Sequence, residues 1–146
     1  MKISTKGRYG LRVMLELANR YGNGPTMMSE IAECQKISRK YLHSMLVNLK
    51  KVGLVRSIRG AGGGYVLAKP PSDILASEIV QALEGPFLPV DCLLDVSLCE
   101  NTNQCVAREI WHEVGDAVRN VLASYTIEQI AAKQKAMEKQ ANMFHI

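Results

Sequence analysis

The spacing of apolar and polar residues predicts successive helices in the first part of the chain. Ser4 or Thr5 can cap the first helix, whose apolar positions recur at the helical period. These positions are Leu11, Met14, Leu15 and Ala18. A Gly-Asn-Gly-Pro run then interrupts the pattern, as expected of a helix boundary. A short second helix fits residues 28–35, with Ile31 and Ala32 facing inward.

A third helix and a hairpin follow. Ser38 is the expected N-terminal cap of the helix, and Gly53 stands where a glycine commonly ends one. The apolar side of this helix consists of Tyr41, Leu42, Met45, Leu46 and Leu49. Two strand-like runs, 54–58 and 65–68, are joined by a glycine-rich segment. Because this order of elements is that of a winged helix-turn-helix, we expect residues 1–71 to form a DNA-binding domain.

The rest of the chain divides into three segments. Residues 72–104 contain a short helix over 77–83 and then a loop with little periodicity. Residues 105–125 are expected to form a long helix, and residues 126–146 to hold a last helical segment that ends near residue 135 before a frayed tail. The long helix carries an apolar stripe of Ile110, Val114, Ala117, Val118, Val121 and Leu122. We expect this stripe to hold a homodimer, the alternative being that it packs on its own domain.

The expected fold is therefore mostly α-helical with a small β-hairpin wing, a winged helix-turn-helix followed by a long dimerisation helix. Residues 1–70 carry 13 Lys and Arg but 3 Asp and Glu, a net charge of +10, whereas residues 71–146 carry 5 and 11, a net charge of −6. A basic half favours a polyanionic partner such as double-stranded DNA. With neither an 18-residue apolar run nor a signal-peptide pattern, we expect a cytoplasmic protein with no membrane partner.

The third helix and the hairpin hold the candidate DNA-binding residues. A helix presented by a short turn can read base edges with its N-terminal part, which here contains Ser38, Arg39, Lys40, Tyr41, His43 and Ser44. At the hairpin, arginines accompany a glycine-rich tip that can lie along a groove: Arg56, Arg59, Gly60, Gly62 and Gly63. The alternatives are a solvated helix with Tyr41 in the core and a plain tight turn. A phosphate-binding loop is excluded, because the glycines lead into a strand and no Gly-Lys-Ser/Thr follows.

Three cysteines in the loop before the long helix form the candidate metal site. Cys92, Cys99 and Cys105 are spaced C-x6-C-x5-C, without the close pair typical of zinc sites. A disulfide would leave one thiol unpaired. A stretch of this length can wrap an iron–sulfur cluster, which prefers thiolate ligands, and a redox-sensing set of thiols is the alternative. Cys34 stands apart, and we expect it to be a small buried residue.

Taken together, the opening residues 1–9 (MKISTKGRY), the wing residues 55–65 (VRSIRGAGGGY) and the three-cysteine loop resemble the IscR-type family of regulators. This family also includes nitric-oxide, iron and cysteine-metabolism regulators, and the resemblance extends from residue 1 to about residue 131. It implies a homodimeric winged-helix transcription regulator with one cluster per subunit at Cys92, Cys99 and Cys105. In the iron–sulfur-biogenesis branch the cluster is two-iron two-sulfur, and its presence tunes promoter choice.

One position departs from that branch. Arg108 stands where the branch typically has a histidine ligand, and a guanidinium offers only donors. His112 lies about 10 Å further along the helix, and Arg8 stands where some relatives supply a carboxylate from the partner. Nearer carboxylates are Asp95, Glu100 and Glu109. The fourth ligand therefore stays open.

Enzymatic activity is not expected. The three histidines, His43, His112 and His145, have no paired nucleophile or acid in the sequence, and no cofactor fingerprint appears. Two hypotheses remain: a regulator that senses iron–sulfur cluster status, or a thiol-redox or nitric-oxide-responsive regulator of the same fold.

Overall fold

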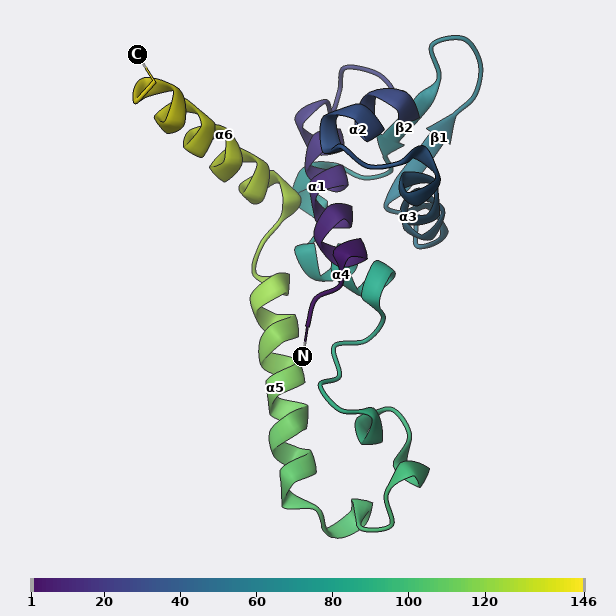
Figure 1. The fold of residues 1–146 in the computed structure, drawn as a ribbon, viewed down its shortest axis with the longest axis vertical. Helices are drawn as coiled ribbons and strands as arrows, with labels where there is room; N and C mark the ends of the chain where they lie inside the picture. The colour runs from purple at the N-terminus through teal and green to yellow at the C-terminus, as the bar shows by residue number, and fades with distance from the viewer. Residues whose placement is uncertain (1, 146) are drawn as a thin grey trace.

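The computed structural model describes residues 2–145 and is mostly helical, with one two-stranded antiparallel sheet among them (Figure 1). In chain order the elements are α1 (Thr5–Asn19), α2 (Met28–Gln35), α3 (Arg39–Lys51), β1 (Val55–Ile58), β2 (Gly64–Leu67), α4 (Ala76–Glu84), α5 (Val106–Ala123) and α6 (Ile127–Met143). Short 3-10 turns lie at Pro71–Asp73, Asp91–Leu93, Val96–Leu98 and Thr102–Gln104. The predicted order of elements, including the hairpin, is confirmed.

Capping residues set the helix ends in the N-terminal domain. The Ser4 hydroxyl accepts the backbone N–H two residues later at 3.1 Å, so Ser4 rather than Thr5 caps α1. The Ser38 hydroxyl accepts the N–H of Tyr41 at 3.1 Å, as the prediction of a cap for α3 requires. Gly53 follows α3 with φ of 76°, a left-handed conformation that favours glycine.

The core lies where α1, α2, α3 and α4 meet. Its fully buried side chains include Val13, Met14, Ile31, Leu42, Met45, Leu46, Leu49, Ile74 and Ile79. On α1 the core-facing line differs from the prediction: Val13 and Leu17 are buried, whereas Leu11, Leu15 and Ala18 are only partly buried. The reason is that α1 has neighbours on more than one side: Leu15 packs against the edge of the core and also lines an apolar groove with residues of α6.

The wing is fixed to the helical domain by a third backbone segment. Strands β1 and β2 pair antiparallel with Val55 opposite Leu67. Thr26, which is buried, adds a bridge on the other edge of β2, with N–H···O bonds of 3.0 and 2.8 Å exchanged with Tyr65. A Cβ on Gly64 would lie 2.3 Å from the Thr26 carbonyl oxygen, so only glycine permits this approach. The loop between α1 and α2 therefore anchors the wing.

Helix α4 packs closely against α1. A Cβ on Gly10 would lie 1.9 Å from Leu83, which shows how near the two helices run. The Glu84 carboxylate accepts the backbone N–H groups of Ser4 and Gly7, each at 3.0 Å, and the Ser4 hydroxyl as well. A carboxylate at a helix N-terminus also complements the helix dipole. The end of α4 thus stabilises the start of α1.

The second half of the chain extends away from this domain. Helix α5 and the loop before it run side by side below α4, whereas α6 projects on the side opposite the wing (Figure 1). The expectation that the last helix ends near residue 135 is wrong, because α6 continues to Met143. Its extra turns are rich in Ala, Met, Glu, Lys and Gln, which favour helix without apolar periodicity. None of the helices described within residues 2–145 is both long and apolar enough to cross a membrane.

Candidate DNA-binding surface and cysteine loop

The outward face of α3 presents polar and basic side chains. The predicted contact residues Ser38, Arg39, Lys40, His43 and Ser44 are all exposed. Two of the hydroxyls have local partners, since Ser38 caps the helix and the Ser44 Oγ donates to the Tyr41 carbonyl at 2.7 Å. Arg39, Lys40 and His43 are therefore the long polar side chains that this face offers to a base edge or a phosphate.

Tyr41, also predicted to contact DNA, lies differently. It is only partly exposed and packs against the core cluster. Its ring meets that of Tyr9 edge to face, with centroids 6.3 Å apart and an interplanar angle of 86°. The Arg12 guanidinium lies 5.0 Å above the Tyr9 ring. This environment supports the packing alternative for the Tyr41 ring.

The wing carries Arg59 and its glycines at an exposed tip, whereas Arg56 lies near the start of β1, opposite Val66. Arg56 and Arg59 are exposed, and so are Gly60 and Gly62, whose φ angles are 103° and 76°. Gly63 closes the turn by donating its N–H to the Gly60 carbonyl at 3.0 Å. The predicted hairpin is therefore a compact turn that leaves both arginines accessible, a form suited to lie in a groove of DNA.

A hydrogen bond that the sequence did not predict joins the two parts of this surface. The Lys50 Nζ donates to the Ser57 Oγ at 2.9 Å, which links the end of α3 to β1. Lys50 lies in the last turn of α3, where a cation complements the helix dipole. Nothing in the local sequence indicates that Lys50 bonds to Ser57. The link helps to hold α3 and the wing as one binding surface, which we call the α3–wing surface.

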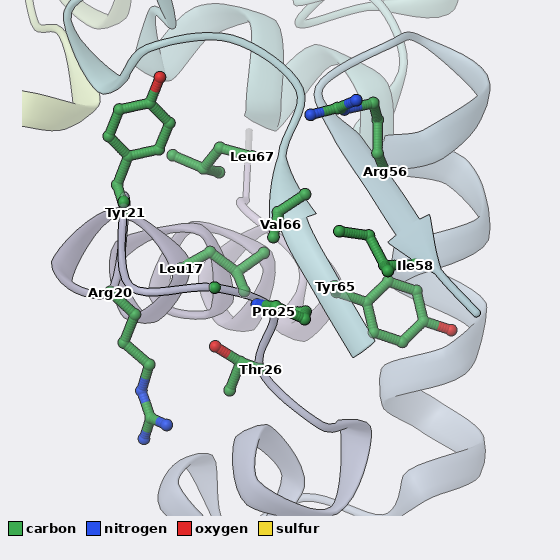
Figure 2. Close-up of a pocket in the computed structure, with 12 residues that line it drawn as sticks. Leu17, Arg20, Tyr21, Pro25, Thr26, Arg56, Ile58, Tyr65, Val66 and Leu67 are labelled. Carbon is green, nitrogen blue, oxygen red and sulfur yellow. The ribbon is translucent and has the colours of Figure 1, made fainter. Parts of the chain in front are cut away.

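Behind the wing lies a half-open cavity of about 320 Å³ between β2, the end of α1 and the loop that follows it (Figure 2). Leu17, Pro25 and Leu67 provide apolar walls, while Arg20 points away from the interior (Figure 2). Arg20 instead bonds to Glu16 at 2.8 Å. The wing is consequently packed at its Thr26 anchor but not along its whole inner face.

The three loop cysteines lie in a segment without a core of its own. None of residues 88–105 is buried; Cys99 is exposed and Cys92 and Cys105 are partly exposed. Within residues 2–145, no three Cys, His, Asp or Glu side chains lie close enough together to hold a metal ion. The donor set nevertheless suits iron–sulfur chemistry, because it consists of accessible thiols, which such clusters prefer. The prediction of Cys92, Cys99 and Cys105 as ligands therefore stays a prediction.

Arg108, and two of the residues weighed as a fourth ligand, Asp95 and His112, have other contacts. The Arg108 Nε donates to the Cys92 carbonyl at 3.4 Å, so it ties α5 to the loop rather than offering a ligand. The Asp95 carboxylate accepts the Ser97 hydroxyl at 2.7 Å and the Ser97 N–H at 2.9 Å, and these bonds lower the pKa of Asp95 below its usual value. His112 pairs with Asp116 at 3.1 Å.

The expectation that Cys34 is buried is wrong. Helix α2 has about two turns, and its buried side is filled by Ile31 and Ala32. Cys34 is consequently exposed, and the Arg20 Nη2 lies 3.8 Å from its sulfur.

Helix α5 leaves a long apolar face uncovered. Gly115 is the buried residue of α5 and lies against the backbone of Phe87. A Cβ on Gly115 would lie 2.4 Å from the Phe87 carbonyl oxygen. The exposed large apolar side chains of the helix are Val106, Ile110, Trp111, Val114 and Val121. Of the predicted stripe, Ile110, Val114, Ala117 and Val121 are therefore exposed, whereas Val118 and Leu122 are partly buried.

Comparison with known proteins gives consistent matches over this architecture. The sequence profile of the Rrf2 family, described as "Iron-dependent Transcriptional regulator", matches residues 3–133. The HTH-type transcriptional regulator CymR of Bacillus subtilis is 46% identical over 146 residues, all of both chains. Its solved structure, described as that of the global cysteine regulator, has a TM-score of 0.75 at 47% identity and covers 91% of this chain and 98% of its own.

Two further solved structures are similar. IscR of T. potens is 36% identical with a TM-score of 0.73, over 100% of this chain and 92% of its own. An oxidised form of CymR from Staphylococcus aureus is 39% identical with a TM-score of 0.71, over 90% of this chain and 96% of its own. These identities and coverages are enough to establish the family.

Proposed function

Because the chain belongs to the Rrf2 family of transcriptional regulators, we propose that it binds an operator as a homodimer through the α3–wing surface. The observation that carries this proposal is the hydrogen-bonded link of α3 to the wing, which joins an exposed basic helix face to an exposed arginine and glycine tip. Such a surface can read the major groove with α3 and follow the backbone or the minor groove with the wing. Two copies would read two half-sites.

The exposed face of α5 supports the homodimer. Val106, Ile110 and Val121 are between 53% and 71% exposed, which is unusual for a row of large apolar residues on one helix. The face repeats at helical intervals, so a second copy of the same helix can cover it by two-fold symmetry.

We further propose that Cys92, Cys99 and Cys105 bind an iron–sulfur cluster, of the two-iron two-sulfur type found in the biogenesis branch. The description of the family as iron-dependent and the likeness to IscR of T. potens support this assignment. A bound cluster would supply a signal of iron and sulfide availability. Cys105 directly precedes α5, so a ligand held there would order the first turn of the proposed dimer helix and could change the spacing of the two α3–wing surfaces.

The alternative is a thiol-based regulator without a cluster. It is favoured by the identity of 46% to CymR of B. subtilis, described as a global cysteine regulator, and by the oxidised form of CymR from S. aureus. The exposure of Cys99 and the place of Arg108 at the histidine position of the cluster-binding branch also agree with this alternative.

Anaerobic purification of the full chain separates these hypotheses. The cluster proposal predicts coloured protein with iron and acid-labile sulfide in equal amounts, lost in Cys92→Ala, Cys99→Ala and Cys105→Ala but kept in the control Cys34→Ala. Colourless protein without iron would reject the cluster. A change of operator affinity on treatment with hydrogen peroxide, reversed by a thiol reductant, would then establish the alternative. Equal affinities of cluster-loaded and cluster-free protein for every genomic operator would mean that the cluster does not regulate binding.

A further inference from the structure

The outward face of α3 contains one apolar side chain among its polar ones. Val47 is 46% exposed, although it lies in the middle of a helix whose opposite side is fully buried. It follows Lys40, His43 and Ser44 at positions i, i+3, i+4 and i+7, so the four residues share one face. Recognition helices read bases in the major groove with side chains at this same spacing.

Folding gives no reason for a valine at this position. Val47 is not among the partly buried residues that pack on the core cluster. A β-branched residue is also a weaker helix former than alanine, glutamate or lysine, which normally fill exposed helical positions. Isolated surface valines are common, but this one stands on the face that the proposed function presents to DNA. Its position therefore points to a ligand with an apolar group inside a polar groove.

We infer that Val47 contacts the 5-methyl group of a thymine and so determines the base preferred at one position of each half-site. In the major groove, thymine is the base that presents a methyl group. His43 lies one turn earlier on the helix and can bond to a neighbouring base edge. The exposed Lys51 lies one turn later and can meet a phosphate. The inference rests on the proposed function, because it requires α3 to enter the major groove.

The test begins with operators selected by the purified full-length protein from a random-sequence duplex pool. Each thymine of the enriched sequence is then replaced by uracil, which lacks only the methyl group. For the wild-type protein, we expect one thymine per half-site whose replacement weakens binding about fourfold, the effect of losing one buried methyl-sized group. In Val47→Ala this discrimination disappears, while Val47→Thr, which keeps one methyl group, retains part of it.

A matched control is Val52→Ala. Val52 is 55% exposed but lies at the cap that ends α3, and its replacement should leave the thymine–uracil ratio at the wild-type value. Because Val47 and Val52 are both exposed, neither replacement should lower the melting temperature. If the wild-type protein enriches no sequence, the proposed operator-binding function fails. If it enriches an operator but every thymine–uracil ratio is the same in Val47→Ala as in wild type, the inference about Val47 is wrong and the proposed function stands.

Discussion

The two halves of this protein bury their apolar residues to very different extents. In the N-terminal half, apolar side chains of α1 to α4 close around one core. Within residues 2–145, eleven large side chains are fully buried, of which Ile127 alone lies beyond α4. From residue 88 to the end of α5, a segment that the structure describes throughout, Gly115 is the one buried residue. Valines, leucines and a tryptophan of this segment are exposed. The comparison teaches that the first half, together with Ile127 of α6, buries its apolar side chains within the monomer, whereas the second half leaves a long apolar face uncovered.

The largest expected effect is the loss of the proposed dimer in Ile110→Glu, which tests whether the exposed face of α5 contacts a second copy. The Ile110 side chain is 53% exposed in the monomer, so the change should not unfold the chain. In a homodimer it would bury one carboxylate per subunit, at several kcal/mol per ion. Analytical ultracentrifugation should show dimers for the wild type and monomers for this variant.

The matched control for that experiment is His112→Glu, which places the same charge about 200° around α5 from Ile110. It should remain dimeric. A dimeric Ile110→Glu protein, or a wild type that is monomeric at micromolar concentration, would refute the dimer proposal.

A second prediction sharpens the difference in stability between the halves. Leu46→Ala removes a fully buried side chain and should lower the free energy of unfolding by about 2–5 kcal/mol. Leu94→Ala in the cysteine loop removes a side chain that is 70% exposed and should change it by less than about 0.5 kcal/mol. Urea unfolding followed by circular dichroism measures both. Similar losses in the two variants would mean that the loop is packed as tightly as the core.

A third prediction concerns the wing. Arg59→Ala removes an exposed cation at the hairpin tip, so the fold should be unaffected. If Arg59 meets a phosphate, operator affinity should fall and the slope of log affinity against log salt should become less steep by about one unit. If it enters the minor groove, the loss should depend on A·T content. Fluorescence anisotropy at several salt concentrations measures these effects, and unchanged affinity on every operator would remove Arg59 from the binding surface.

The smallest expected effect lies in the cysteine loop. The hydroxyl and N–H of Ser97 stabilise the ionised Asp95 and lower its pKa below 3.8. A lowered pKa means that these bonds contribute fully to the turn at higher pH and are lost only as the pH falls through the folded-state value. An NMR titration of the Asp95 carboxyl carbon should give a midpoint below 3.8, returning toward that value in Ser97→Ala. Identical midpoints would show that Ser97 does not hold the carboxylate in solution.

The comparison also explains how far the sequence predicted the structure. The helices and the hairpin were predictable, because their caps and apolar periods are local signals, as at Ser38 and Gly53. The N-terminal cap by Glu84 and the Thr26 bridge to the wing were not, because each joins residues distant in the chain. Cys34 was wrongly expected in the core because the pattern of a two-turn helix cannot show which side its neighbours cover.

The candidate site divides in the same way. The exposed residues of α3 and the two arginines of the wing were predictable from element order and composition. The packing of Tyr41 against Tyr9 and the Lys50–Ser57 bond depend on tertiary contacts that no spacing encodes. The three cysteines were found by their spacing, but the proposed cluster requires their thiols to converge, and within residues 2–145 no three such side chains lie close enough to hold a metal ion.

The backbone around Leu75 and Thr126 has one more consequence. These residues form an antiparallel bridge, flanked by bonds of 3.0 Å from Ala76 N–H to Tyr125 and of 2.8 Å from Ile127 N–H to Ile74. The chain leaves the DNA-binding domain after α4, runs through the loop and α5, and returns to within a hydrogen bond of where α4 began. The segment with closely spaced ends is therefore 76–125, and it includes α4, which packs against α1. A replacement for residues 86–124 would have to lead from the end of α4 back to its start, so the packing of α4 on α1 constrains how long the loop and α5 can be.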